Sequence, residues 1–390
     1  MIMGNIKELD KQYIAGTYSR FPIVITHGKG SLLYDEDGKE YIDLGSGIAV
    51  NSFGACDDEW KAAVTEQLRK IQHTSNLYYT EPCVKVAEML SKMSGMKKAF
   101  FCNSGAEANE GAIKAARRYA EKKKGANYYN IITLENSFHG RTLTTLAATG
   151  QPVFHEHFGP LTPGFVNMPV NDIETLLVTV SEKKTAAIMI ECVQGEGGVN
   201  PLDRDFVNEI AKIYKEKDIL LIVDEVQTGL CRSGEYFAYQ SYGITPDIVT
   251  VAKGLGGGLP IGAVLLGEKV QDVLEPGEHG STFGGNLISC AGAISVLSRM
   301  DENLLADVKK KSEYIKNRLE EAEGVEFVGG LGLMLGIKTK KPAKDVVSKA
   351  MENGVLCLTA KDKVRLLPAL NIPQDLLEKA IDVLIDACKE

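Results

Sequence analysis

Lys253 and Asp224 are the residues whose type and position most directly indicate chemistry. Lys253 ends the apolar run DIVTVA and precedes the glycine-rich run GLGGGLPIGA. A lysine in a partly desolvated site loses its proton more easily and becomes an amine nucleophile that can form a Schiff base. Flanking glycines would let a flat cofactor lie close to the backbone. Considered alone, Lys253 is more simply explained as a solvent-reaching lysine at the end of a strand.

Asp224 closes the apolar run ILLIV, which predicts a buried central strand. A carboxylate there is costly unless a cation or a strong donor meets it. A protonated pyridine nitrogen is such a partner, and enzymes that use pyridoxal 5'-phosphate (PLP) keep the ring an electron sink in this way. An acid satisfied by backbone donors explains the residue equally well.

A third feature could bind an anion. The predicted strand KKAFFCN is followed by Ser104, Gly105, Ala106 and Glu107 and then by a helical run. Ser104 and Glu107 have capping-box spacing, and a helix that starts after a glycine exposes backbone N–H groups to an anion such as phosphate. By itself, a well-capped helix is the simpler interpretation.

The elements that must position these residues form an alternating pattern. From about Trp60 onward, helices alternate with short apolar runs, which predicts a mostly parallel sheet covered by helices. The predicted strands are 97–103, 129–136, 186–192, 219–225, 247–253 and 262–267. Ligands of such sheets lie beyond the carboxyl ends of the strands. We therefore expect the segments that follow these strands, at Asn103, Asn136 to His139, Glu191, Asp224 and Lys253, to converge on one crevice.

Three segments are expected along the chain. An N-terminal segment, 1–58, contains a hairpin at 31–44 around Asp37-Gly38 and should pack with the small domain. A large cofactor-binding domain, 59–288, includes a stretch at 151–171 that we expect to be an active-site loop. The C-terminal segment, 289–390, forms a smaller α+β domain with helices at 301–323, 343–353 and 374–389.

Bulk properties restrict the partners. The 390 residues carry a net charge of -8, which argues against phosphate-driven nucleic-acid binding. No apolar segment is long enough for a bilayer and the start of the chain lacks a signal peptide, so no membrane partner is expected. Eight scattered cysteines without metal-ligand spacing predict reduced thiols, a cytoplasmic location and no metal site.

Taken together, the motifs resemble the class III (ornithine-type) PLP-dependent aminotransferases of fold type I, most closely the members that act on N2-acetylornithine. The likeness covers nearly the whole chain. The motifs that carry it are NSGAEAN from Asn103, SFHGRT from Ser137, VQGEGG from Val193, DEVQTG from Asp224, TVAKGLGGGLPIGA around Lys253, HGSTFGGN from His279 and VRLLPALN from Val364.

The resemblance implies how the cofactor PLP would be held. Lys253 would form the Schiff base and later move the proton between substrate and cofactor. Asp224 would pair with the pyridinium nitrogen, Gln227 would lie near the phenolic oxygen, and Phe138 would stack on the ring. Gly105 and Ala106 would donate backbone N–H groups to the phosphate, helped by Thr282 of the other subunit of a homodimer with shared active sites.

The resemblance also implies two small-molecule substrates that use one site in turn, an ω-amino donor and 2-oxoglutarate. Arg141 would grip the carboxylate of acetylornithine and the distal carboxylate of glutamate, because guanidinium binds carboxylate through two parallel bonds. Arg365 would bind the α-carboxylate of glutamate, Glu196 would cover Arg365 in the other half-reaction, and Ser281 is a further candidate for substrate contact.

Val50 narrows the donor. Ornithine δ-aminotransferases resemble one another in carrying a tyrosine at this position, which contacts the free α-amino group, so a small apolar residue favours an N-acylated ornithine. The expected reaction is transamination of N2-acetylornithine with 2-oxoglutarate, giving N-acetylglutamate 5-semialdehyde and glutamate, as in arginine biosynthesis. The alternatives are donors such as ornithine, succinylornithine, succinyl-diaminopimelate or 4-aminobutyrate, a glutamate-1-semialdehyde aminomutase, or a binding protein without catalysis.

Overall fold

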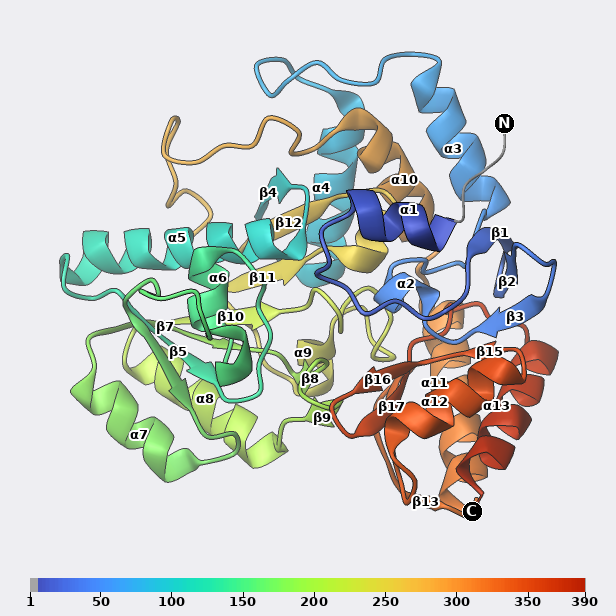
Figure 1. Cartoon of the computed structure of the whole chain (residues 1–390). Coiled ribbons are helices and arrows are strands. Elements are labelled where there is room, and N and C mark those ends of the chain that lie inside the picture. The colour runs from blue at the N-terminus through green and yellow to red at the C-terminus, as the bar shows by residue number, and fades with distance from the viewer. Residues whose placement is uncertain (1–5, 390) are drawn as a thin grey trace.

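A computed structural model describes residues 6–389 (Figure 1), so the first five residues of the expected N-terminal segment lie outside the described range. Its largest sheet has seven strands in the order β4-β12-β11-β10-β7-β5-β6. Only β12 runs antiparallel to its neighbours, which confirms the mostly parallel α/β arrangement. The strands are β4 (Lys98–Cys102), β5 (Asn130–Leu134), β6 (Phe165–Met168), β7 (Thr185–Ile190), β10 (Leu220–Asp224), β11 (Ile248–Val251) and β12 (Gly262–Leu266).

The expected loop at 151–171 is corrected by the structure. It contains a 3-10 turn, η1 (Pro152–Phe154), and the edge strand β6. An edge strand pairs on one side only, here with β5, and remains partly solvated. Four residues flanked by prolines and a glycine are too short to show a hydrophobic period, so the sequence pattern did not reveal this strand.

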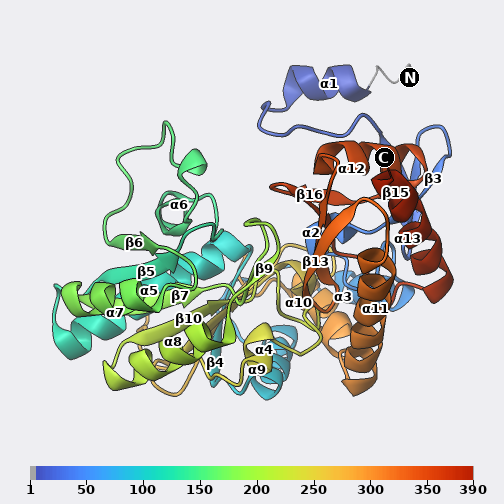
Figure 2. The ribbon, with the colours of Figure 1, turned by 90° about the horizontal axis from the view of Figure 1, so that it is seen from below.

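Helices cover both faces of the large sheet because its buried side chains alternate. Ala187, Met189, Leu220 and Ile222 face α5 (Gly105–Lys124), whereas the neighbouring residues face the opposite helices. Those helices are α4 (Glu81–Ser94), α7 (Ile173–Glu182), α8 (Arg204–Glu216) and α9 (Ala238–Ser241). The central strands are therefore buried on both faces, and Figure 2 shows the helices on either side of the sheet.

The C-terminal part builds a smaller α+β unit. Its sheet has the order β13-β14-β17-β16 and all pairs are antiparallel. The elements are β13 (Val325–Leu331), β14 (Met334–Thr339), β16 (Leu358–Ala360), β17 (Lys363–Leu366), α11 (Glu302–Glu320), α12 (Ala343–Glu352) and α13 (Gln374–Cys388). The three predicted C-terminal helices are confirmed.

The N-terminal strands join the C-terminal unit through a further sheet. The predicted hairpin is present, with Gly38 at φ 79° in its turn. The elements are β1 (Ile25–Lys29), β2 (Leu32–Asp35), β3 (Glu40–Asp43) and β15 (Val355–Leu356), and β15 pairs in parallel with β3. The remaining elements are α1 (Ile6–Tyr13), α2 (Ser46–Ala49), α3 (Asp58–Leu68), α6 (Leu143–Ala148), β8 (Val193–Gln194), β9 (Asn200–Pro201) and α10 (Leu287–Leu297). The division of the chain at residues 58 and 288 stays a prediction.

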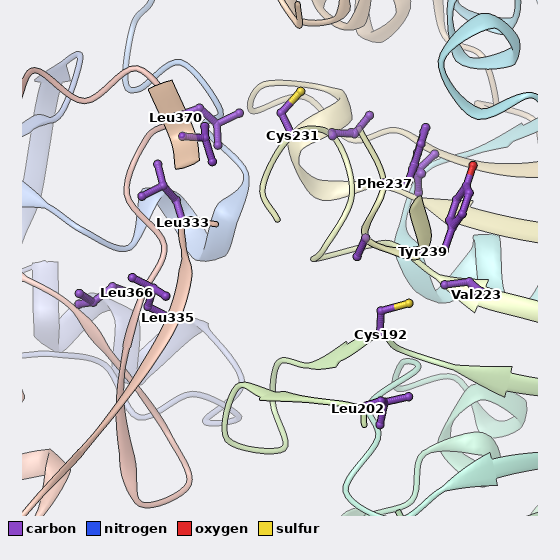
Figure 3. Close-up of a cluster of buried hydrophobic side chains, with 14 of the residues drawn as sticks. Cys192, Leu202, Val223, Cys231, Phe237, Tyr239, Leu333, Leu335, Leu366 and Leu370 are labelled. Atoms are coloured by element: carbon purple, nitrogen blue, oxygen red, sulfur yellow. The ribbon is translucent and has the colours of Figure 1, made fainter. Parts of the chain in front are cut away.

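One hydrophobic cluster connects the two units. Figure 3 shows Leu333, Leu335, Leu366 and Leu370 of the C-terminal unit, and they belong to the same buried cluster as Val223 of the large sheet. Each fully buried leucine contributes about 1.5–3 kcal/mol through the hydrophobic effect. The cluster therefore fixes the C-terminal unit beside the ends of β7 and β10.

Helix α1 differs from the rest of the chain. It lies apart from the other elements in Figure 2, and none of its residues is buried within one chain. No helix within 6–389 has the length and apolar character needed to cross a bilayer.

Candidate active site

The carboxyl ends of the central strands open on a cavity of about 410 Å³. Segments that follow β4, β5, β7, β10 and β11 line it, as the strand pattern predicted. The predicted site residues that line the cavity are Val50, Gly105, Ala106, Phe138, Arg141, Glu196, Asp224, Gln227 and Lys253. Residues separated by two hundred positions in the sequence thus meet in one place.

Asp224 is buried, and three donors surround its carboxylate. Its Oδ2 lies 2.8 Å from Nδ1 of His139 and accepts from Asn109 Nδ2 at 2.7 Å. Its Oδ1 accepts from the backbone N–H of Val226 at 3.0 Å. Burial acts to lower the pKa of His139, but the hydrogen bond to Asp224 and the charges of Asp224 and Glu191 together outweigh it, so this pKa lies above its ordinary value. The arrangement holds the carboxylate in a fixed orientation at the edge of the cavity.

Lys253 starts the short turn η2 (Lys253–Leu255), with Ala252 between it and the end of β11. Its φ of 41° lies in the left-handed region, where a non-glycine residue costs about 1–3 kcal/mol. Behind it, the Oγ of Ser52 donates to the carbonyl of Gly254 at 3.2 Å, and a Cβ on Gly254 would lie 2.7 Å from that Oγ. Burial lowers the pKa of Lys253, which favours the neutral, nucleophilic amine.

The start of α5 supplies an anion-binding end. The Oγ of Ser104 accepts from the backbone N–H of Glu107 at 3.1 Å, so the predicted cap is present. The N–H groups of Gly105 and Ala106 belong to the first turn, whose donors have no partner within the helix. A Cβ on Gly105 would lie 2.7 Å from Val226, so only glycine allows this close packing.

Glu196 and Arg365 form an ion pair between the two units. Nη1 of Arg365 donates to Oε1 of Glu196 at 2.6 Å and also lies 3.4 Å from Oε1 of Gln227. The side chain of Arg365 is 4% exposed and that of Glu196 is 31% exposed. Burial acts to raise the pKa of Glu196, but Arg365, with smaller contributions from Lys253 and Gln227, outweighs burial and lowers this pKa. The guanidinium is therefore fixed in β17, and its acidic partner is the more accessible member.

Arg141 lies at the mouth of the cavity against two aromatic rings. Its guanidinium carbon is 3.8 Å from the ring centre of Phe154 and 5.4 Å from that of Phe138. The two rings are in edge contact, with their centres 5.9 Å apart. An exposed guanidinium held over aromatic faces keeps its N–H groups free to bind a carboxylate.

Ser281 and Thr282 do not line the cavity within the described part of this single chain. The Oγ of Ser281 accepts from Asn103 Nδ2 at 3.2 Å, so it lies one residue away from the cavity wall. Thr282 is exposed. The geometry of one chain thus separates these two residues from the other predicted site residues.

The sequence pattern assigned no role to three residues of the site. Asn109 and His139 both bind Asp224, and Asn109 also accepts from Thr250 Oγ1 at 2.7 Å. Glu191 lines the cavity and binds two backbone N–H groups around it. A polar residue among the alanines of a buried helix face was the available signal for Asn109, and a strand-end position was the signal for the other two.

These groups fit the cofactor that the resemblance implies. The cavity is in the size range of small-molecule and cofactor sites. Asp224 offers a buried acid for a pyridinium, the start of α5 offers donors for a phosphate, and Lys253 offers an amine with a lowered pKa. An α/β sheet with these three groups along its carboxyl edge defines a PLP-dependent transferase site of fold type I.

Comparison with known proteins agrees with this class. Residues 13–388 match the family described as Aminotransferase class-III, and the chain belongs to this family. The acetylornithine aminotransferase of Haemophilus ducreyi is 48% identical over 392 residues, covering 100% of each chain. That of Methanocaldococcus jannaschii is 46% identical over 396 residues, covering 100% of this chain and 98% of the relative.

Solved structures give the same fold. The ornithine aminotransferase of Toxoplasma gondii ME49 has a TM-score of 0.94 at 32% identity, covering 98% of this chain and 94% of that chain. The N-acetylornithine aminotransferase of Stenotrophomonas maltophilia K279a has a TM-score of 0.84 at 34% identity, covering 97% of each chain. Class III aminotransferases are PLP enzymes, so the expected family, fold and enzyme class are confirmed.

Proposed function

We propose that the protein transfers the terminal amino group of N2-acetylornithine to 2-oxoglutarate, with PLP as cofactor, giving N-acetylglutamate 5-semialdehyde and glutamate. The pairing of buried Arg365 with more accessible Glu196 is the observation that carries this proposal. Glutamate has an α-carboxylate beside the reacting amine, whereas the terminal amine of acetylornithine has none. A site that serves both needs a cation that an acid of the protein covers when the substrate supplies no carboxylate.

The cofactor, when bound, supplies an electron sink that accepts the amino group and returns it to the oxo acid. The chain's own groups hold and prepare it. Asp224, held in place by His139 and Asn109, would pair with the ring nitrogen. Gln227 would lie near the phenolic oxygen, Phe138 would cover one face of the ring, and the start of α5 would bind the phosphate. Lys253 acts as the amine that carries a proton to and from the reacting carbon, for which a lowered pKa is required.

Arg141 and Arg365 divide the recognition of substrate carboxylates. Arg141 binds the carboxylate that lies far from the reacting amine in both substrates, since it is exposed and stacked at the mouth of the cavity. Arg365 binds only the α-carboxylate of glutamate or 2-oxoglutarate. Glu196 must then leave Arg365, and its partial exposure gives it space to do so.

Two observations favour the acetylated donor over ornithine: the side chain of Val50 and the sequence identity to named relatives. Val50 lines the cavity with an apolar side chain, which offers no partner to a free α-ammonium group. Relatives at 40–48% identity are named acetylornithine aminotransferase. The ornithine aminotransferase of Toxoplasma gondii has the same fold but is only 32% identical. Ser281 is proposed as a further substrate contact next to the cavity.

The proposed assembly is a homodimer in which Thr282 of the second subunit completes the phosphate site. Large apolar side chains are exposed in one chain at Leu77, Tyr78, Tyr79 and Phe283. The two segments that carry them are adjacent, because Asn76 Nδ2 donates to the carbonyl of Gly284 at 2.9 Å. The eight cysteines are free thiols, which supports a cytoplasmic location.

Steady-state rates with four donors test the substrate. We expect acetylornithine to be preferred over ornithine, succinylornithine and 4-aminobutyrate, with an absolute requirement for 2-oxoglutarate. The visible absorbance of the purified protein should change when acetylornithine is added alone and revert with 2-oxoglutarate. Turnover of one substrate without an oxo acid would instead indicate an aminomutase, and a preference for ornithine would overturn the proposed donor.

A further inference from the structure

Glu191 follows β7 and is 6% exposed, yet its side chain lines the cavity. Each of its carboxylate oxygens accepts from a different backbone segment. Oε2 accepts from the N–H of Phe138 at 2.9 Å, and Oε1 accepts from the N–H of Gly195 at 3.4 Å. One buried carboxylate thus joins two segments that are distant in sequence.

The two segments carry different parts of the site. Phe138 precedes Arg141, and its ring is the one proposed to cover the cofactor. Gly195 precedes Glu196, the acid paired with Arg365. A Cβ on Gly195 would lie 2.4 Å from Oε1 of Gln227, so a displacement of this backbone would also displace Gln227. A shift of either segment would therefore move the other, because Glu191 is hydrogen-bonded to both.

We propose that Glu191 is a positioning residue that holds the Phe138 segment and the Gly195–Glu196 segment in register, so that the ring contact and the acid covering Arg365 are set together. The catalytic importance of this register rests on the proposed function. The geometric part, two N–H bonds to one carboxylate, stands without it.

Only a carboxylate satisfies both donors. A glutamine would present one acceptor oxygen and one NH2 group, which would point a donor at a backbone donor. One of the two N–H groups would then be buried without a partner. Aspartate keeps the charge but withdraws the oxygens by about one methylene, which should weaken the longer bond to Gly195 more than the bond to Phe138.

The charge state of Glu191 should modulate the contact near neutral pH. Burial raises the pKa of Glu191 to about 7, with His139 lowering it and Asp224 raising it. Lys253 and the thiol of Cys192 are the other titratable groups that it influences. Below neutral pH a proton occupies one oxygen and weakens one of the two acceptors. Above it both N–H groups meet a charged acceptor.

Glu225 offers a matched control. It is also buried, it directly follows the neighbouring strand β10, and burial likewise raises its pKa to about 7. Its oxygens accept from Tyr239 N at 2.9 Å and from Thr228 Oγ1 at 2.5 Å, and it does not line the cavity. Loss of a buried carboxylate in general is therefore separable from loss of the contact proposed for Glu191.

The test compares Glu191→Gln, Glu191→Asp and Glu225→Gln with the wild-type protein by hydrogen exchange, with and without PLP. We expect exchange at Phe138 or Gly195 to rise roughly tenfold in Glu191→Gln, as for one lost hydrogen bond to a charged group. In Glu191→Asp the rise should be larger at Gly195. Glu225→Gln should leave both amides unchanged and affect α9 instead.

The functional readout uses absorbance to follow each half-reaction separately from pH 6 to pH 8. Wild type should show a pH step near 7 in the ratio of donor to glutamate half-reaction rates, and Glu191→Gln should lose this step while Glu225→Gln keeps it. Equal exchange changes in the Glu191 and Glu225 variants, or a pH step that survives Glu191→Gln, would overturn the proposal.

Measurements on the wild-type protein test the role of Glu191 even if the variants do not fold. If the Glu191 variants do not fold, wild-type exchange at Phe138 and Gly195, corrected for intrinsic pH dependence, should become less protected as pH rises from 4.5 to 7, because opening the contact returns the raised pKa of Glu191 to its ordinary value. Flat protection would overturn the proposal. If acetylornithine is not a substrate, the proposed function fails, but the exchange measurements still test Glu191.

Discussion

Replacing Glu196 with alanine should separate the two half-reactions. In the wild type, Oε1 of Glu196 lies 2.6 Å from Nη1 of Arg365. Without the carboxylate, the buried guanidinium has lost its acid partner whenever acetylornithine occupies the site. Glutamate brings its own α-carboxylate and restores a partner. The donor half-reaction should therefore slow, while the glutamate half-reaction should hold its rate or improve because no acid competes for Arg365.

The size of the effect follows from the burial of the pair. A hydrogen bond to a charged group contributes about 1.5–3 kcal/mol. The lower part of this range, about 1.5–2 kcal/mol, applies because Glu196 is 31% exposed and partly screened by water. Since about 1.4 kcal/mol corresponds to a factor of ten, the ratio of glutamate to acetylornithine half-reaction rates should rise roughly 10- to 30-fold. Glu196→Gln, which keeps an acceptor without charge, should give an intermediate value.

Single-turnover absorbance measurements on the cofactor-loaded protein give each half-reaction separately. Glu135→Ala is the matched control, because Glu135 is an acid that directly follows β5, has an exposed side chain and does not line the cavity. It should leave the ratio unchanged. If Glu196→Ala slowed both half-reactions by the same factor, the ratio would not move, and the proposed exchange of partners at Arg365 would be wrong.

Three further predictions concern other residues of the same region. Lys253→Ala should reduce turnover at least 10²- to 10⁴-fold, the usual contribution of a proton-transferring group, while thermal unfolding shows a folded protein; normal turnover would refute its role. Val50→Tyr should slow acetylornithine and favour ornithine, measured as the ratio of kcat/KM values; an unchanged ratio would remove Val50 as the determinant. Because the folded pKa of Glu225 is raised to about 7 from an ordinary 4.5, its contribution to stability is fully present below pH 4.5 and is lost as pH rises to 7. Glu225→Gln should remove that slope from unfolding free energies measured by denaturant titration, and a retained slope would refute the assignment.

The sequence predicted the large sheet because its strands are buried on both faces. Each is a short apolar run between turn residues, and such runs are typical of central parallel strands. The same rule failed at β6, which pairs with β5 alone and needs only one apolar face. The sequence pattern also gave no reason to expect that none of the residues of α1 is buried. The burial of a helix depends on the elements against which it packs, and the pattern does not specify these.

The sequence predicted those site residues whose position at the end of an apolar strand already indicates their chemistry. It did not predict those whose role depends on a partner far away in the sequence. Asp224 and Lys253 each end an apolar strand, so both could be placed on one edge. The role of Asn109 depends on Asp224, 115 residues later, and on the carbonyl of His139, to which it donates at 2.7 Å. Periodicity does not encode such pairings, and only the folded chain reveals them.

Dual specificity, on this reasoning, depends on the movable acid more than on the cation. Arg365 is fixed in β17 and buried, and its Nε has no hydrogen-bond partner among the described residues. A guanidinium held in this way cannot withdraw when its carboxylate is absent, and leaving it unpaired is costly. Glu196 follows β8 in a turn, and its side chain is 31% exposed, so this side chain has space to swing away from Arg365. Selectivity between the two substrates should therefore respond to the stiffness of that turn, which Glu191 anchors through Gly195.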